Sequence, residues 1–322
     1  MKHMEPFGNE SLTGVILLGF SETPHLVVPL FCFFLAAYVL CIGGNTFLSM
    51  LIVSQPQLQT PMFILMGHLA FVDVCFTSII IPRALYSLLS GDTHISIYGC
   101  FAQLFLFLAA GIMENFLLAI MAFDRYSAVC FPLHYLQIMS KRTCMCLVTI
   151  FWIIGFSHSS LYTALTSSQP HCSQVIHHFF CDLPVVVLLA CSGTSDTLQR
   201  AVFTEGFIVI FGPMFFILGS YILIARAVLT LKSSQGRWKT FSTCTSHLTM
   251  VVLFYGTVIF IYFRPSSIYT PTYDRDISMV YSVINPMLNP FIYSLRNKEI
   301  KNAVRAILQR GRKRLQQFTA KT

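Results

Sequence analysis

Three acidic residues lie inside stretches of this sequence that are otherwise apolar: Asp73, Glu114 and Glu205. Placing a charged side chain in hydrocarbon is costly, so an acid at such a position indicates a functional group. A carboxylate there can hold a cation, take up a proton when its surroundings change, or pair with a charged ligand. These residues therefore predict a site for ions, protons or ligands within the apolar part of the chain.

Two asparagines add uncharged polar groups at comparable depth, Asn45 in the first apolar stretch and Asn289 in the last. Together with Asp73 and Glu114 they form a candidate polar cluster that could bind a sodium ion or change protonation when helices shift. The alternative is a hydrogen-bond network that only holds the helices together. No other cofactor or metal is predicted.

Glu205 stands apart from this cluster, near the outer end of its apolar stretch. One interpretation is that its carboxylate pairs with a cationic group of a ligand. The other is that a side chain so near a helix end reaches water.

We find no HExxH zinc motif, no phosphate-cradling glycine loop and no nucleophile constellation, so no enzymatic activity is predicted.

A charged tripeptide, Asp124-Arg125-Tyr126, follows the third apolar stretch, where the membrane would meet the cytoplasm. Further along, Pro213, Pro286 and Pro290 lie inside apolar stretches. A proline in a membrane helix frees a backbone carbonyl and permits a bend, provided that a neighbour satisfies this carbonyl again. A bend beside asparagines suits a helix that switches between two shapes, whereas a static kink is the alternative.

The elements that must position these residues follow from the hydropathy of the chain. Hydrophobic residues make up 55% of the 322 residues and charged residues only 11%, and the mean hydropathy is +0.68. Apolar blocks long enough to cross a bilayer cover 27–53, 62–89, 97–120, 143–165, 200–231, 241–263 and 276–295. We predict an all-α membrane protein: a seven-transmembrane helix bundle over 27–296, an extracellular tail over 1–26, and a cytoplasmic tail over 297–322.

Basic residues predict the orientation, because lysine and arginine in short loops stay on the cytoplasmic side. Such residues gather on one side of the predicted membrane, at Arg125, Lys141, Arg142, Arg226, Lys232, Arg237 and Lys239 and throughout 296–321. The amino terminus is therefore expected outside the cell, in a multi-pass plasma-membrane protein. There Asn9 opens an Asn-Glu-Ser acceptor for glycosylation.

The tail after the seventh block has Ile300, Val304, Ile307 and Leu308 at helical spacing among basic residues. This pattern predicts a short amphipathic helix on the anionic inner leaflet, with simple solvation of the tail as the alternative. The net charge of +8 thus indicates membrane lipids as partners and not nucleic acid, because the basic residues cluster at membrane ends.

Four of the eleven cysteines fall on the oxidising outer face: Cys100, Cys172, Cys181 and Cys191. They can pair in three ways. Disulfides here would pin the long outer loop between the fourth and fifth blocks over the bundle and shape a pocket beneath it. The remaining cysteines are predicted to be reduced packing residues.

Several motifs, in this order along the chain, carry a resemblance to a known family. They are Gly44-Asn45, PMFILMGHLAFVD ending at Asp73, MAFDRYSAVC ending at Cys130, Ser220-Tyr221, KTFSTCTSHL ending at Leu248, and PMLNPFIYSLRN ending at Asn297. From Leu17 to Asn297 the chain resembles the odorant receptors of the rhodopsin-like G-protein-coupled receptor family. The last two motifs are similar to the land-vertebrate branch, whereas Phe123 is similar to the older branch.

The resemblance implies specific roles for matching residues. It implies a Cys100–Cys181 bridge and a second bridge between Cys172 and Cys191. It also implies that Asp73 and Glu114 form a buried acidic pair. The residues expected around the G-protein-facing switch are Asp124, Arg125, Tyr126, Tyr221, His247, Asn289 and Tyr293.

The ligand pocket of such receptors lies between the outer halves of helices three, five, six and seven. At corresponding depth the third block presents one helical face with Phe107, Leu108, Gly111 and Ile112. The facing candidates are Glu205, Val209, Tyr255, Val258, Ile259, Tyr262, Met279 and Ser282. A mostly apolar lining of this kind suits a small volatile compound, and ordinary packing of the bundle is the alternative role for these residues.

The resemblance implies an odorant receptor that activates a heterotrimeric stimulatory G protein of the olfactory type and raises cyclic AMP, in the cilia of olfactory sensory neurons. A non-olfactory or amine-sensing receptor is the first alternative. An ion-coupled transporter is the second, because acids and broken helices in the membrane also occur in carriers. A retinal-binding opsin is disfavoured, because the seventh block contains no lysine for a Schiff base.

Overall fold

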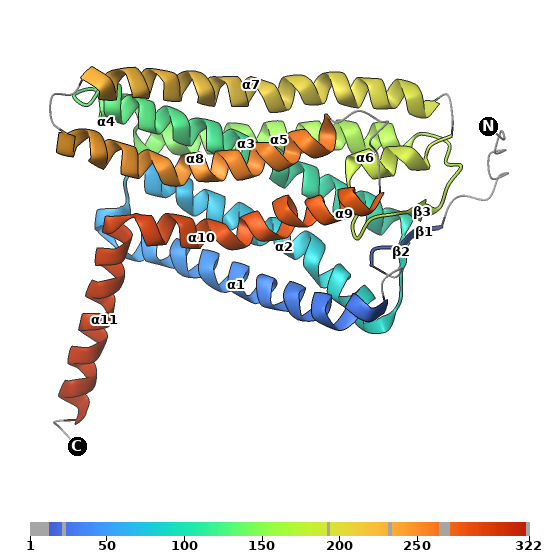
Figure 1. Cartoon of the computed structure of the whole chain (residues 1–322), viewed down its shortest axis with the longest axis horizontal. Helices are drawn as coiled ribbons and strands as arrows, with labels where there is room; N and C mark the ends of the chain where they lie inside the picture. Colours follow the sequence, from blue (N-terminus) through green and yellow to red (C-terminus); the bar gives the residue numbers. More distant parts are fainter. Residues whose placement is uncertain (1–12, 21–23, 192–193, 231–233, 264–270, 320–322) are drawn as a thin grey trace.

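The computed structural model describes residues 13–20, 24–191, 194–230, 234–263 and 271–319. Long helices lie side by side along the longest axis of the molecule, and a small sheet lies at one end (Figure 1). The helices of the bundle are α1 (Val27–Ser54), α2 (Pro61–Ser90), α3 (Ile97–Cys130), α5 (Lys141–Ser167), α7 (Thr194–Thr230), α8 (Ser234–Tyr262) and the pair α9 (Pro271–Met279) and α10 (Asn285–Arg296). The predicted seven-helix fold is therefore confirmed.

In the described part of the chain, six helices are long and apolar enough to cross a membrane. The seventh span is interrupted, because a π-helical turn (Val280–Ile284) separates α9 from α10. Large apolar side chains on the outside of the bundle, such as Val39 and Met50 on α1 and Ile208 on α7, are more than half exposed. Such surfaces suit contact with lipid and not with water.

Local signals explain where several helices begin and end. Ser96 accepts a hydrogen bond from the backbone N–H of Gly99 and so caps the start of α3. Ser140 does the same for α5 through Thr143. α2 ends at Gly91, whose φ of +72° is a left-handed conformation that favours glycine.

α3 is the central helix of the bundle. It packs against α2, α5, α7 and α8. Its buried residues include the polar side chains Gln103, Glu114, Asn115 and Asp124. Because hydrocarbon offers no hydrogen-bonding partner, these side chains must find partners on neighbouring helices, which makes α3 the element that organises the polar sites.

α1 and α10 approach each other closely at Gly44. A Cβ atom at this position would lie 2.8 Å from Cγ of Pro290, too close for any larger residue without displacement. The next residue, Asn45, then reaches across to α10, where its Nδ2 donates to the carbonyl of Pro286 at 3.0 Å. The Gly44-Asn45 motif thus packs one helix tightly and delivers a hydrogen bond to the other.

The carbonyl that Asn45 contacts has lost its partner within the helix. The residue four positions on is Pro290, which has no N–H to donate. The same arrangement recurs on α7, where Pro213 leaves the carbonyl of Val209 without a helical donor and Asn115 on α3 donates to it at 2.8 Å. In each of these two helices, therefore, the carbonyl freed by a proline is satisfied by an asparagine of a neighbouring helix.

A small sheet covers the outer end of the bundle, which the sequence did not predict. Its strands are β1 (Gly14–Leu17), β2 (His94–Ser96) and β3 (Val175–Ile176), in the order β2-β1-β3. β1 pairs antiparallel with β2, with Val15 opposite Ile95, and parallel with β3, with Ile16 opposite Val175. Pairing with the amino-terminal segment thus satisfies part of the backbone of the outer loop.

The loop between α5 and α7 is further ordered by short helices and two disulfides. It contains α6 (Leu183–Val186) and a 3-10 helix (Val187–Leu189). Cys100 at the start of α3 is bonded to Cys181, and Cys172 is bonded to Cys191. Gln103 on α3 also accepts from the backbone N–H of Cys181 at 2.9 Å. These bonds hold the loop against the bundle.

The opposite end of the bundle carries α4 (Tyr135–Ile138) and α11 (Lys298–Thr319) (Figure 1). α11 leaves the bundle at a steep angle to the long helices. Ile300 and Ala303 at its start are buried, whereas Leu308 is 61% exposed. Apolar residues further along α11 are therefore exposed where this helix would lie on the membrane surface.

Two further 3-10 helices, Pro24–Leu26 and Pro56–Leu58, flank α1.

Candidate functional site

A cavity of about 90 Å³ lies among α2, α3, α5, α7, α8 and the π-helical turn, beneath the outer loop. Most of its lining is apolar or aromatic. Its residues are Phe76, Phe107, Leu108, Gly111, Ile112, Asn115, His158, Leu183, Val202, Glu205, Gly206, Val209, Ile210, Phe254, Val258 and Tyr281. An apolar cavity with a few polar groups has the character of a small-molecule site.

Many of the predicted ligand contacts lie in this lining. α3 contributes Phe107, Leu108, Gly111 and Ile112, as its helical face predicted. The facing helices contribute Glu205, Val209 and Val258. The structure thus brings these side chains together around one space, and contact with a ligand stays a prediction.

Other predicted contacts do not line the cavity, for reasons that the structure gives. Tyr255 points to α3, where its hydroxyl donates to Oδ1 of Asn115. Ser282 donates to the carbonyl of Ser278 within its own helix at 2.6 Å. Ile259 and Met279 are absent from the lining as well. The side chain of Tyr262 lies outside the described residues, as does Asn9 with its glycosylation motif.

Several lining residues were missed by the sequence analysis. They are Phe76, Asn115, His158, Leu183, Val202, Gly206, Ile210, Phe254 and Tyr281. Two of them carried a usable signal, since Asn115 and His158 are polar residues within apolar blocks. The others are ordinary apolar or aromatic residues, and nothing in their types separates them from core packing.

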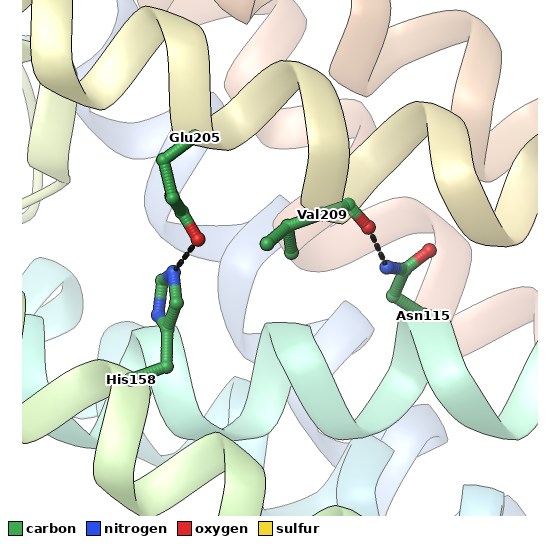
Figure 2. Close-up of polar contacts among 4 residues, drawn as sticks. All are labelled: Asn115, His158, Glu205 and Val209. Atoms are coloured by element: carbon green, nitrogen blue, oxygen red, sulfur yellow. Dashed lines mark hydrogen bonds and ion pairs between the residues drawn. The ribbon is translucent and has the colours of Figure 1, made fainter.

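Glu205 was expected to stand apart from other polar residues, but the structure gives it a polar partner. Figure 2 shows its carboxylate on α7 directed toward the ring of His158 on α5. Nε2 of His158 lies 2.6 Å from Oε1 of Glu205. Because the side chain of Glu205 is only 30% exposed, this pair is a partly buried polar feature in an apolar wall.

The floor of the cavity is a hydrogen-bonded junction of three helices. Nδ2 of Asn115 on α3 donates to the carbonyl of Val209 on α7, and Oδ1 of the same amide accepts from Tyr255 on α8 (Figure 2 shows the first bond). Val209 and Asn115 also line the cavity. A ligand above this junction would therefore touch residues whose positions fix how α3, α7 and α8 sit together.

The predicted polar cluster is partly assembled deeper in the bundle. Nδ2 of Asn289 donates to both carboxylate oxygens of Asp73, at 2.9 and 2.7 Å. Asn45 points away to Pro286, and Glu114 is buried with an Oε2 atom that has no hydrogen-bond partner among the described residues. No group of three or more histidine, cysteine, aspartate or glutamate residues suited to a metal occurs in the described part. The sodium ion stays a prediction.

At the inner end, predicted switch residues form a second junction of helices. Tyr221 on α7 lies 2.7 Å from Nδ1 of His247 on α8, and Nε2 of His247 lies 3.0 Å from the carbonyl of Leu118 on α3. The tautomer with the proton on Nε2 satisfies both contacts, because it accepts from Tyr221 and donates to Leu118. His247 thus ties the inner part of α8 to both neighbours.

The remaining switch residues surround this junction without a shared network. Asp124 accepts a hydrogen bond from Tyr135 of α4 at 2.7 Å. Within the described residues, Nε of Arg125 and the hydroxyl of Tyr293 are buried without a hydrogen-bond partner. Tyr126 packs edge-on against Phe131.

A titratable residue outside the membrane, His178 in the outer loop, is unusual. Its ring is stacked on Phe179 and edge-on to Phe180, and its Nδ1 lies 3.1 Å from the carbonyl of Phe180. Burial, assisted by the positive charge of Arg275 and opposed by the hydrogen bond to Phe180, lowers the pKa of His178 from 6.5 to about 3. The loop is therefore built around a neutral imidazole.

The comparisons with known proteins agree with this architecture. The family model described as olfactory receptor matches residues 31–311. Human olfactory receptor 1L4 is 44% identical over 94% of this chain and 97% of its own length. The dog olfactory receptor-like protein OLF1 is 45% identical over 92% of this chain and 96% of its own length.

A solved structure supports the fold independently. The crystal structure of squid rhodopsin matches 87% of this chain and 85% of its own chain with a TM-score of 0.68 at 18% identity. At that identity the likeness establishes the seven-helix fold and nothing finer. Together with the family match over most of its length, it shows that this chain belongs to the olfactory receptor family of non-enzymatic, multi-pass membrane receptors.

Proposed function

We propose that this chain binds a small volatile odorant in the cavity between α3, α5, α7 and α8 and then activates a heterotrimeric stimulatory G protein of the olfactory type. The amino terminus would face the outside and α11 the inner leaflet, in the ciliary membrane of sensory neurons. The basic residues at the inner ends support this orientation.

The observation that carries this proposal is the continuity between the cavity and the inner junction. α8 contributes Val258 to the lining, Tyr255 to the floor and His247 to the inner junction. A ligand that favours another position of Tyr255 would therefore also change how the inner part of α8 is held. Outward movement of that part would uncover Arg125 for the carboxyl terminus of the G protein.

The proposed mechanism is a population shift. A ligand moves the equilibrium between two arrangements only by the difference in its affinity for them, so tight binding alone would not signal. Odorants would raise cyclic AMP because they bind the G-protein-competent arrangement better. Membership of a receptor family argues against the transporter alternative.

The experiment is a cyclic AMP assay in cells that express the surface-stained receptor, with a chemically broad odorant panel. Arg125→Ala, stained to the same level, is the coupling control. A ligand-dependent rise that is lost in Arg125→Ala supports the proposal. No rise with any odorant despite full surface staining, or a rise that persists in Arg125→Ala, contradicts it.

A further inference from the structure

Glu205, on the outer wall of the cavity, is the only acidic residue among the described residues of the lining. Its carboxylate is approached from α5 by His158, whose Nε2 lies 2.6 Å from Oε1. An ionised carboxylate has about four lone-pair sites, so one donor leaves it with acceptor capacity to spare.

The other polar side chains of the lining are already engaged. The amide of Asn115 is held between the carbonyl of Val209 and the hydroxyl of Tyr255. The hydroxyl of Tyr281 donates to Oδ2 of Asp182 at 2.6 Å. The hydrogen-bonding capacity that remains for a ligand is therefore concentrated at Glu205 and His158.

His158 adds a second acceptor and no net charge in the arrangement that its contacts favour. Its Nδ1 atom is buried and has no hydrogen-bond partner among the described residues. The neutral tautomer with a proton on Nε2 donates to Glu205 and leaves Nδ1 as a bare lone pair. The imidazolium form would bury an unpaired N–H, which is costly. In this tautomer His158 does not compensate the charge of an ionised Glu205.

Among the described residues, no lysine or arginine lines the cavity. The lining therefore has a net negative charge at one pole, spare capacity for accepting hydrogen bonds at that pole, and an apolar body formed by residues such as Phe107, Ile112 and Val258. A carboxylate ligand would meet a like charge there, whereas a cationic donor would meet its complement.

We propose that the ligand class of this cavity is a small primary or secondary aliphatic amine, bound as the ammonium ion. Its N–H groups donate to the carboxylate of Glu205, and its hydrocarbon part packs on the apolar walls. Both an ammonium and an alcohol can donate to the carboxylate, but only the ammonium adds the attraction of opposite charges, so an alcohol of the same length binds more weakly. This inference rests on the proposed receptor function of the same cavity.

The test uses the full receptor in the cyclic AMP assay with three matched probes: pentylamine, 1-pentanol and pentanoic acid. The expected order of sensitivity is amine, then alcohol at a half-maximal concentration at least tenfold higher, with the acid inactive. Cells without the receptor correct for direct effects of the probes. This ranking requires no variant, so a folding defect cannot obscure it.

Glu205→Gln, which keeps the shape of the side chain, is expected to weaken the pentylamine response at least tenfold and to change the 1-pentanol response less than threefold. Asp276→Asn is the matched control, because it removes an exposed acid on the outer part of α9. It should leave all three responses unchanged, whereas an equal loss in both variants would indicate general attraction of cations and would overturn the proposal.

Two further outcomes separate this inference from the proposed function. A receptor that answers neutral odorants but not pentylamine, or whose Glu205→Gln variant keeps its amine response, overturns amine recognition and leaves the receptor function standing. A receptor at the cell surface that answers no odorant of the broad panel overturns the receptor function, and this inference falls with it.

Discussion

Asn115 on α3 donates a hydrogen bond of 2.8 Å to the backbone carbonyl of Val209 on α7. This carbonyl has no donor in its own helix, because the residue four positions on is Pro213. The pair therefore joins the backbone of α7, next to its proline, to the central helix directly under the cavity. The relationship leads to the first prediction.

Asn115→Leu should lower the stability of the receptor by about 1–3 kcal/mol, the usual cost of leaving a buried carbonyl unsatisfied. Pro213→Ala restores an N–H that can reach the carbonyl of Val209, so the same substitution should cost less in a Pro213→Ala background. Thermal unfolding of the purified receptor in detergent measures both. Equal losses in the two backgrounds would show that the freed carbonyl is not what Asn115 satisfies.

The second prediction concerns the two disulfides of the outer loop. Cys172–Cys191 closes a short segment with a sequence separation of 19, whereas Cys100–Cys181 joins the loop to α3 across a separation of 81. A crosslink that closes a longer segment restricts the unfolded chain more. Cys100→Ser with Cys181→Ser should therefore reduce surface staining more than Cys172→Ser with Cys191→Ser. The reverse order would contradict this view of the loop.

The third prediction is a pH dependence from His178. Its folded-state pKa of about 3 lies below the ordinary value of 6.5, so the unfolded chain binds an additional proton between these values. The stability that depends on the neutral imidazole is therefore present above pH 6.5 and is lost as the pH falls below it, at up to about 1.4 kcal/mol per pH unit.

Thermal unfolding of the purified receptor between pH 7.5 and 4.5 measures this effect. The wild type should lose stability on acidification, and His178→Gln should lose less over the same range. A wild-type profile that matches the His178→Gln profile would mean that the histidine is not held neutral by burial.

The fourth prediction concerns the inner junction. Nε2 of His247 lies 3.0 Å from the carbonyl of Leu118, and outward movement of α8 would break this contact. His247→Phe keeps a ring of similar size but removes both hydrogen bonds of the junction, each worth about 1 kcal/mol. Basal cyclic AMP, normalised to surface staining, should rise by roughly two- to tenfold.

The rise should disappear when Arg125→Ala is added, because the increase must pass through the G protein. Unchanged or lower basal cyclic AMP in His247→Phe, at equal surface staining, would show that the contact does not restrain α8.

The membrane spans could be predicted from the sequence because their hydropathy depends only on local composition. The blocks at 27–53 and 62–89 fall within α1 and α2 almost to the residue. The disulfide pairing was predicted from the family resemblance, because the positions of the four cysteines alone allowed three pairings. The outer sheet was not predicted, because β1, β2 and β3 are short and pair across distant parts of the chain.

The site was harder to predict than the spans because it depends on helix rotation. Neighbouring residues on a helix point about 100° apart. Phe254 lines the cavity where Tyr255 was expected, and Tyr281 does so where Ser282 was expected. Pairing of His158 with Glu205 depends on how α5 and α7 pack, which hydropathy does not determine. The lining residues of α3 could be predicted because their spacing in the sequence puts all four on one face of a helix.

The most direct test of the central claim, that ligands act from the cavity between α3, α5, α7 and α8, is to fill the cavity. A Cβ atom at Gly111 would have only Phe76 in ordinary contact at 3.8 Å, so Gly111→Leu can place its side chain in the cavity without displacing the backbone. Gly212→Leu makes the same change on α7, at an exposed position with nothing within 4 Å.

Concentration–response curves for cyclic AMP should be compared at equal surface staining. We predict that Gly111→Leu raises the half-maximal odorant concentration at least tenfold or abolishes the response, while Gly212→Leu matches the wild type. An unchanged response in Gly111→Leu would contradict ligand action from this cavity.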